Sequence, residues 1–403
     1  MSSKAASKQQ NNITTAMMVI LAVACGLVVA NLYYSQTLVG PISKALGLAP
    51  GVAGLIVTLT QIGYVTGLLF IVPLSDRLEN RRLIVSLLFV VVLALILAAV
   101  SPGAVIFLTA ALLIGSGSVV AQILVPLAAS MSSEQQRGRV VGNVMSGLLL
   151  GIMLARPISS LVAGLWGWRT IFVLSAILMA LLALMLTRAL PTRYPESKLS
   201  YFQLVGSLIG LLKIYPILRR RAFYQACLFG SFSLFWTTVP LRLVDEYEMS
   251  QRGIALFALV GVAGAIAAPI GGRWADKGFT KIITASAIIT AIASFLLIAI
   301  VHDKSHLSLG LLFLVAITLD MAVSANLVTS QRIIYSLGNE ARGRLNGLFM
   351  AIFFIGGAFG SFLGGLSYAH GGWVWSTCVG GAFPFLAFLF FLTEPKSRKK
   401  RAS

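Results

Sequence analysis

The stretch Pro73-Leu74-Ser75-Asp76-Arg77-Leu78-Glu79-Asn80-Arg81-Arg82 is a short charged loop between two long apolar runs. Its pattern returns much later in the chain as Gly272-Arg273-Trp274-Ala275-Asp276-Lys277-Gly278-Phe279-Thr280-Lys281. In both copies an Asp stands just beyond the end of a hydrophobic run, and cations follow it. Arg137-Gly138-Arg139 likewise recurs as Arg342-Gly343-Arg344. Two repeats at nearly the same offset indicate that one half of the chain repeats the other.

A loop of the form G-x-L-x-D-R-x-G-R-R between the second and third membrane helices, repeated between the eighth and ninth, is typical of the major facilitator superfamily. The chain resembles that family over nearly its whole length. Within the family, the stretch Ala30-Asn31-Leu32-Tyr33-Tyr34-Ser35-Gln36 and the first loop resemble bacterial members near the drug:proton antiporters. The first loop departs from the pattern at Val72 and Glu79, where the family has glycine, and the second copy keeps both glycines.

The composition excludes a soluble protein. Of the 403 residues, 58% are hydrophobic and 11% are charged, and a soluble chain cannot bury that much apolar surface. The net charge of +19 does not indicate nucleic-acid binding, because membrane proteins concentrate Lys and Arg in cytoplasmic loops. Cys25, Cys227 and Cys378 are scattered without a CxxC pair, so we expect no disulfide, metal or cofactor.

Apolar runs of roughly 20 residues can span a membrane, and the sequence contains twelve. The predicted spans are 14–36, 51–72, 83–101, 103–129, 140–164, 168–188, 222–242, 253–272, 281–301, 307–330, 345–368 and 374–392. We therefore expect an all-α membrane protein with two six-helix halves related by an internal repeat, the major facilitator fold. The N-terminal bundle would be residues 1–190, the cytoplasmic linker 191–221 and the C-terminal bundle 222–403.

The positive charges predict the orientation of these spans. Of the 31 Lys and Arg, all but six lie at the termini or in loops on one side of the membrane. The exceptions are Lys44, Arg169, Arg242, Arg252 and Lys304 in the opposite loops, and Arg156 inside a span. By the positive-inside rule, both termini are cytoplasmic. The linker stretch 201–217 is expected to lie as a helix on the inner membrane surface, held by anionic headgroups or acting as a docking site.

Asp320 is the one acid of the twelve that lies in the middle of a predicted span. A charge at that depth is costly, at about 3 kcal/mol on insertion scales. It is either a buried packing residue or a carboxylate that binds a proton on one side and releases it on the other. We therefore name Asp320 as the candidate for proton coupling, with Ser324 on about the same helix face as a substrate contact.

Arg156 is the second intramembrane charge. It either snorkels to the outer surface or faces the cavity, where it holds an anionic group of the substrate or pairs with Asp320. Its planar guanidinium suits a carboxylate bidentately.

Other polar and aromatic side chains fall on single helix faces and together suggest a polar cavity, although each alone is explained by an interhelix hydrogen bond. The candidate substrate contacts are Asn31, Tyr34, Gln61, Tyr64, Gln122 and Trp236. The Arg and Gln that drug:proton antiporters carry on helix 4 are Ala111 and Ile114 here, so their proton relay is not expected.

Small residues indicate close helix contacts at Gly147 and Gly151, and at Gly356, Gly360 and Gly364. These faces predict either static packing or surfaces along which the two halves rock.

The two charged loops are expected to gate the cytoplasmic side. In the family such loops steady the outward-open state, and the resemblance implies the same here. An acid beyond a helix C-terminus is unfavourable unless cations hold it. The predicted gating residues are Asp76, Arg77, Arg81 and Arg82 in the first copy and Asp276 and Lys277 in the second. The alternative is that these loops carry only a topology signal.

These features predict a secondary active transporter in the bacterial cytoplasmic membrane, moving a small organic solute by alternating access. Proton-coupled efflux is the first hypothesis, and uptake by a proton symporter or a facilitator is the alternative. A receptor would be expected to carry an added soluble domain. An enzyme is not expected, because the sequence has no HExxH motif and no nucleotide-binding loop. The expected partners are the solute, protons and the bilayer, with the chain acting as a monomer.

Overall fold

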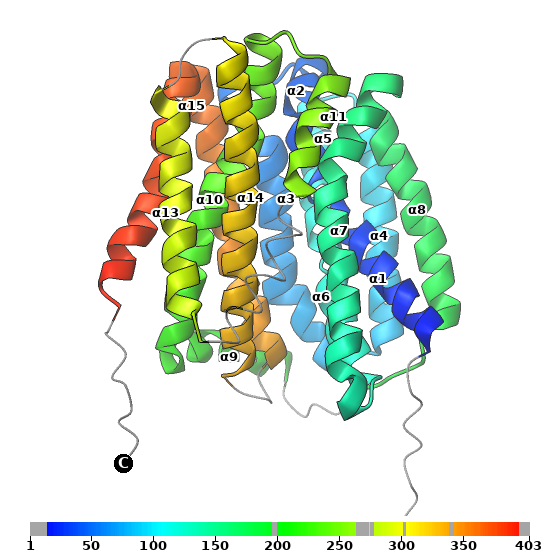
Figure 1. Ribbon diagram of the computed structural model, residues 1–403. Coiled ribbons are helices and arrows are strands. Elements are labelled where there is room, and N and C mark those ends of the chain that lie inside the picture. Colours follow the sequence, from blue (N-terminus) through cyan, green and yellow to red (C-terminus); the bar gives the residue numbers. More distant parts are fainter. Residues whose placement is uncertain are drawn as a thin grey trace, which may run out of the picture.

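The computed structural model describes residues 14–195, 200–262, 274, 278–300, 304–337 and 342–394. Within these ranges the chain forms helices and no strand. Ten of the described helices are long and apolar enough to cross a membrane. Figure 1 shows them as a bundle of roughly parallel helices, with the first residues of α1 (Thr15–Ala30) and the last residues of α15 (Arg342–Leu392) at the same end.

The N-terminal helices follow the predicted spans closely. After α1 come α2 (Val39–Leu46), α3 (Leu55–Thr66), α4 (Asn80–Val100), α5 (Ala104–Gly117), α6 (Val120–Ser130), α7 (Glu134–Trp166) and α8 (Arg169–Ala189). Short turns extend or join them: η1 (Tyr34–Thr37), η2 (Pro50–Val52), η3 (Gly67–Ile71) and η4 (Val72–Asp76).

The first and fourth predicted spans are broken helices. The first leaves α geometry after Ala30, and the fourth is interrupted between α5 and α6. Such breaks at membrane depth require other groups to satisfy the freed backbone atoms. Local side chains do so, since Asn31 Nδ2 donates to the carbonyl of Val28 at 3.2 Å and Ser118 Oγ donates to that of Ile114 at 2.6 Å.

The C-terminal helices are α10 (Pro216–Asp245), α11 (Gln251–Ala258) with the turn η5 (Leu259–Val262), α13 (Thr280–Ile300), α14 (His306–Tyr335) and α15. The backbone of α15 leaves helical geometry at Gly371 and Gly372. The φ of Gly372 is 61°, which glycine adopts without steric penalty. The break falls between the predicted spans 345–368 and 374–392. The predicted span 253–272 lies within the described residues only as far as Val262.

The linker helix α9 (Tyr201–Ile214) lies across one end of the bundle, as Figure 1 shows. It begins with a capping box in which Ser200 and Gln203 satisfy each other's backbone amides. Its buried face consists of Leu204, Leu208 and Leu211. The predicted helix of the linker is therefore present and covers the end of the bundle, called here the α9 end; the opposite end, near α11, is the α11 end.

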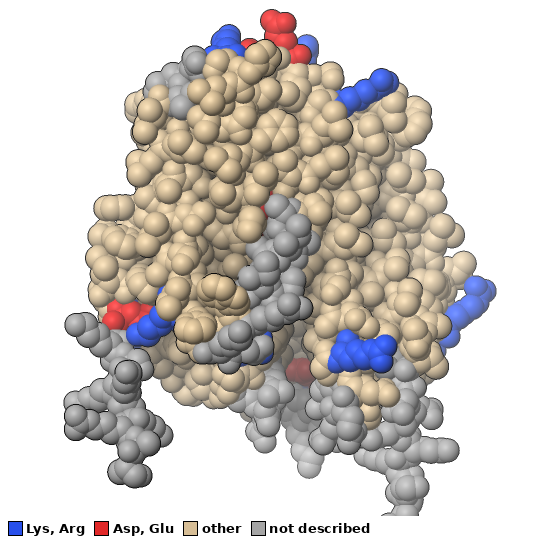
Figure 2. All heavy atoms as spheres, in the orientation of Figure 1, with Lys and Arg blue, Asp and Glu red and all other residues tan. Residues whose placement is uncertain are grey.

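The sides of the bundle are those of a membrane protein. In the view of Figure 2, the described surface between the two ends is almost entirely without charged side chains, which gather at the ends. In the hydrocarbon region of a bilayer, uncharged helical surfaces of this kind meet lipid without leaving polar groups unsatisfied. The α9 end carries the loops whose positive charges predict a cytoplasmic position, and this orientation stays a prediction.

Helix α4 starts at an acid that replaces the family glycine. Glu79 is its N-cap, and its carboxylate accepts hydrogen bonds from the amides of Arg81 and Arg82, both at 2.9 Å, and of Arg193 at 3.4 Å. Burial alone would raise the pKa of Glu79, but the hydrogen bonds from the Arg82, Arg81 and Arg193 amides hold that pKa below its ordinary value. Glu79, which stands where the family has glycine, therefore caps α4 and also holds the start of the linker through the amide of Arg193.

The predicted glycine faces pack helices together within the N-terminal set, α1 to α8, and within the C-terminal set, α10 to α15. A Cβ on Gly147 or Gly151 would lie within 2.3 Å of the α1 backbone, and one on Gly356 or Gly360 within 2.1 Å of the α10 backbone. These are contacts of α1 with α7 and of α10 with α15. In this conformation the faces serve as static packing, and they do not lie between the N-terminal and C-terminal helices.

Candidate functional site

The N-terminal and C-terminal helices meet tightly at the α11 end. Thr58 of α3 and Ser361 of α15 share a hydrogen bond of 2.8 Å between their hydroxyls. Ser160 of α7 donates to the carbonyl of Gln251 at the start of α11, at 2.9 Å. A Cβ on Gly54 would lie 2.3 Å from the carbonyl oxygen of Ser361. Backbone approach this close leaves no passage between α3 and α15.

The same two sets of helices are separated at the α9 end by a cavity of about 770 Å³. Its walls come from η4, α6 and α7 on one side and from α14 and α15 on the other, and Leu208 of α9 also contributes. The polar residues of its lining are Ser75, Asp76, Gln122, Ser130, Gln331, Tyr335, Arg344 and Asn346. The structure is therefore closed at the α11 end and hollow at the α9 end.

The two predicted intramembrane charges are in contact with each other. Arg156 Nη2 on α7 lies 3.3 Å from Asp320 Oδ1 on α14. Arg156 is 1% exposed and Asp320 is 4% exposed, so Arg156 does not snorkel to the surface. The pair joins a helix of the N-terminal set to a helix of the C-terminal set.

Aromatic rings enclose the guanidinium of Arg156. Its Cζ lies 3.9 Å from the ring centroid of Trp236 and 5.1 Å from that of Phe232, both on α10. Rings at these distances stabilise a cation through their quadrupoles. On another side the backbone of η5 approaches: a Cβ on Gly261 would lie 3.1 Å from Arg156 Nη2 and 3.4 Å from Asp320 Oδ2. The pair thus lies where α7, α10, α14 and η5 meet.

Many buried polar atoms in this part of the chain have no hydrogen-bond partner. They are Arg156 Nε and Nη1, Asp320 Oδ2, Trp236 Nε1, Gln61 Oε1, the Tyr64 hydroxyl and both amide atoms of Gln36. An unpaired buried polar atom costs about 1–3 kcal/mol. A polar ligand or water bound among these donors and acceptors would satisfy them.

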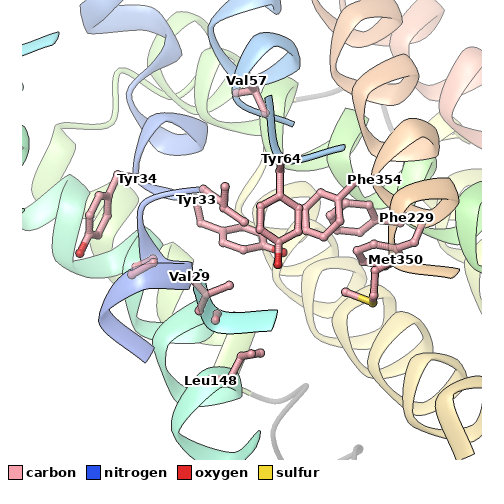
Figure 3. Packing of buried hydrophobic residues seen from close by; sticks show 14 of the residues in the cluster. Val29, Tyr33, Tyr34, Val57, Tyr64, Leu148, Phe229, Met350 and Phe354 are labelled. Atoms are coloured by element: carbon pink, nitrogen blue, oxygen red, sulfur yellow. The ribbon is translucent and has the colours of Figure 1, made fainter. Parts of the chain in front are cut away.

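A cluster of aromatic rings extends from Tyr64 on α3 to the ring that lies against Arg156. Tyr64 packs on Phe354 with ring centroids 4.5 Å apart, Phe354 meets Phe229 at 5.3 Å, and Phe229 stacks on Phe232 at 5.3 Å. Figure 3 shows Tyr64, Phe354, Phe229 and Met350 gathered in one cluster. Since Phe232 lies 5.1 Å from Arg156 Cζ, the cluster reaches the pair.

Two predicted glutamines bridge the two sets of helices. Gln61 Nε2 donates to Ser233 Oγ of α10 at 2.9 Å, and Gln122 Oε1 accepts from Asn346 Nδ2 of α15 at 3.2 Å. Gln122 lines the cavity. Tyr64 and Trp236 also contact residues of the other set of helices, Phe354 and Arg156 respectively, and their role as substrate contacts stays a prediction.

Asn31 and Tyr34 do not belong with these residues. Asn31 Oδ1 accepts a hydrogen bond from Ser175 of α8 at 2.6 Å, within the N-terminal set. Figure 3 shows Tyr34 away from the Tyr64 cluster and Tyr33 beside it. The prediction assumed a continuous helix, whereas the chain leaves α geometry at Asn31 and presents the neighbouring tyrosine instead. Ser324 is half-buried on α14.

The predicted gating residues divide into two groups. Asp76 lines the cavity, and no described cation lies within salt-bridge distance of it. Arg77 and Arg82 are exposed, Arg82 Nε being 3.8 Å from Glu79, and Arg81 is half-buried. Asp276 and Lys277 lie outside the described residues. The first loop therefore supplies an acid to the cavity wall in this conformation.

Three residues of the site were not predicted. Tyr33 lies close enough to Arg156 and Asp320 to interact with them electrostatically, and Gly261 forms one wall of the pair. Asn326, two turns beyond Asp320, donates to Gln225 Oε1 of α10 at 2.6 Å. An Asn inside a span is the signal that would have pointed to it.

Comparison with known proteins agrees with the architecture. The family model of the Major Facilitator Superfamily matches residues 18–335 and 222–403. The chain is 41% identical over 377 residues to the "Uncharacterized transporter YgaY" of Escherichia coli O157:H7, covering 93% of this chain and 94% of that protein. It is 30% identical over 379 residues to the "Probable transporter SCO4007" of Streptomyces coelicolor, covering 93% and 87%.

A solved structure shows the same fold. The crystal structure of a bacterial homologue of the human lysosomal transporter Spinster, in an inward-facing and unoccupied conformation, aligns with a TM-score of 0.73 at 16% identity. The alignment covers 95% of this chain and 98% of that one.

The chain belongs to the Major Facilitator Superfamily. It is a multi-pass membrane transporter of small solutes and not an enzyme.

Proposed function

We propose that this chain is a proton-coupled exporter of a small organic solute, working by alternating access in the bacterial cytoplasmic membrane. The observation that carries the proposal is the Arg156–Asp320 pair, which joins α7 to α14 and is buried among unpaired polar atoms. Each ligand of an alternating-access transporter acts by biasing one equilibrium between two conformations.

Residues 1–190 and 222–403 would be the two moving bodies, with both termini and the α9 end in the cytoplasm. The conformation described here is then open to the cytoplasm through the cavity and closed to the outside by the contacts of Gly54, Thr58 and Ser160. The reverse conformation would break these contacts and close the cavity, with Asp76 drawn to cations across the cavity mouth.

Asp320 would couple protons to this movement. When ionised, it holds Arg156 and favours the conformation seen here. When protonated, it loses the ion pair, so the link between α7 and α14 weakens. A proton arriving from outside and leaving to the cytoplasm at this residue, in exchange for the solute, gives export.

Gradient-driven flux in proteoliposomes tests the proposal. A solute identified by thermal shift is offered with a pH gradient across the membrane. An antiporter accumulates the solute on the more acidic side, a symporter on the more alkaline side, and a facilitator only equilibrates it. Export by antiport predicts the first result for the parent chain, and its loss in Asp320→Asn, while exchange of the solute at equal and saturating concentrations is retained.

A matched control removes an acid elsewhere. Glu248 is exposed at the α11 end, so Glu248→Gln should leave gradient-driven flux unchanged. Accumulation on the alkaline side would replace export with symport, and full gradient-driven flux in Asp320→Asn would remove Asp320 from the coupling.

A further inference from the structure

The Arg156–Asp320 pair has more hydrogen-bonding capacity than it uses. The two groups share one contact, from Nη2 to Oδ1 at 3.3 Å, whereas Arg–carboxylate pairs are frequently bidentate with bonds of about 2.7–2.9 Å. Arg156 keeps two unpaired donors, Nε and Nη1, and Asp320 keeps one unpaired acceptor, Oδ2. Trp236 Nε1 is a further donor beside the Asp320 carboxylate. The site therefore offers free donors and a free anionic acceptor side by side.

The charge balance of the site restricts what can enter it. One cation and one anion are buried together, and the pair is neutral as a whole. While Asp320 is ionised, a monoanion that took Arg156 away from it would leave a buried unpaired carboxylate, and a monocation on Asp320 would leave an unpaired guanidinium. Uncompensated buried charge is strongly unfavourable. A ligand with one positive and one negative group replaces one ion pair by two and keeps the site neutral.

The walls suit such a ligand in chemistry as well. The backbone of Gly261 packs directly against the pair, since a Cβ there would lie 3.1 Å from Arg156 Nη2 and 3.4 Å from Asp320 Oδ2, so only η5 has to move to expose both groups. The faces of Trp236 and Phe232, which already carry the guanidinium, offer an apolar surface that also attracts an ammonium. Phe257 packs on Trp236 at 5.8 Å and extends this surface.

We infer that the solute is a zwitterion with an apolar body, of the α-amino-acid type. Its carboxylate accepts hydrogen bonds from the unpaired Nη1 of Arg156 and from the second N–H of Nη2, its ammonium binds Asp320 Oδ2, and its body lies against the rings of α10. The inference rests on the proposed function in taking this pair as the transport site, and it adds the chemical class of the solute.

A matched series of ligands tests the class. L-Phenylalanine, L-tryptophan, L-leucine and L-methionine are compared with their decarboxylated amines and with their deaminated acids, by thermal shift and calorimetry at pH 7 on the full chain in detergent. We expect at least one amino acid to bind, and to bind at least tenfold more tightly than both of its singly charged counterparts. An amine or acid that binds as tightly as its amino acid, or no binding by any of the four amino acids, overturns the inference.

Two single variants give a readout that a structural role would not produce. Asp320→Asn leaves the cation, so it should prefer the acid over the amino acid; Arg156→Gln leaves the anion, so it should prefer the amine. If either single variant fails to fold, the double variant R156Q/D320N, which buries no charge, should fold and bind all three forms weakly. If the variants that fold still prefer the amino acid over both the amine and the acid, as the parent does, the inference is wrong.

These results separate the solute class from the transport mechanism. If the chain prefers an anion and still exchanges it for protons, the zwitterion inference is wrong and the proposed function holds. If the chain binds zwitterions but does not respond to a pH gradient, the inferred solute class holds and proton coupling is wrong.

Discussion

Gly54 lies where α3 and α15 meet at the α11 end, and Gly54→Ala tests whether this contact closes that end. A Cβ on Gly54 would lie 2.3 Å from the carbonyl oxygen of Ser361 and 3.3 Å from the Cα of Gly365. Carbon–oxygen contacts between packed helices are about 3.3–3.6 Å, so the two helices would have to separate by about 1 Å.

The cost of this change falls on one conformation. Overpacking of a close contact costs about 1–3 kcal/mol, and the cost disappears when α3 and α15 part. A bias of that size changes the ratio of two conformations by about 5- to 150-fold. We therefore expect Gly54→Ala to move the population towards a conformation open at the α11 end and closed at the α9 end.

Spin-label distances in nanodiscs measure both ends. Labels at Gly103 and Gly310 report on the α11 end, and labels at Gly138 and Gly343 on the α9 end; at all four positions a Cβ meets no atom within 4 Å. Exposed Cys378 is replaced by Ser, while Cys25 and Cys227 are buried. Gly54→Ala should lengthen the first distance and shorten the second.

The control is a glycine-to-alanine substitution at a position where the added Cβ meets no other atom. Gly142 lies on α7 with no atom within 4 Å of a Cβ, so Gly142→Ala should give the parent distances. If Gly54→Ala also gives the parent distances while remaining folded, the α3–α15 contact is not what closes the α11 end.

Four further outcomes follow from the site and the caps. Glu79→Ala should lower the stability of the folded chain by about 1 kcal/mol, measured by thermal unfolding. Because the folded-state pKa of Glu79 is lowered, its contribution is complete above its ordinary pKa and is lost as pH falls through the lowered value, so parent and variant should converge in acid. Asp76→Asn should keep the cavity mouth open to cysteine labelling from the cytoplasmic side, and unchanged labelling with unchanged transport would remove the predicted latch. Arg156→Lys should weaken binding of a carboxylate solute about tenfold in calorimetry, since it loses the planar fork. Asp320→Asn and Arg156→Gln should each destabilise by about 3–5 kcal/mol and the double variant by less, and additive losses would show that the pair is not coupled.

The helices and the two buried charges could be predicted from the sequence. Long apolar runs have few alternatives to spanning helices, and observed boundaries lie within a few residues of most predicted ones. Arg156 and Asp320 stood out because charge inside a membrane is costly and has to be paired. Their contact was one of the alternatives that the sequence left open for Arg156, beside snorkelling to the outer surface and holding an anionic group of the solute.

Residues whose position depends on backbone irregularity could not be predicted. The choice of Tyr34 over Tyr33 assumed helical periodicity through a segment that turns into η1. Glu79 is an ordinary loop acid in the sequence, and only the backbone geometry makes it a helix cap. The close approach of Gly54 to α15 joins residues about three hundred positions apart, and periodicity along one helix carries no signal of it.

The most direct test of the account is the pH dependence of the α9-end distance between labels at Gly138 and Gly343. Asp320 faces Arg156 of α7, Trp236 of α10 and Tyr33 beside η1. Its protonation is the proposed switch between the conformation open at the α9 end and the one open at the α11 end. As pH falls, the parent chain should pass from a long distance to a short one, and Asp320→Asn should show the short distance at every pH. An Asp320→Asn variant with the same pH-dependent change as the parent would contradict the account.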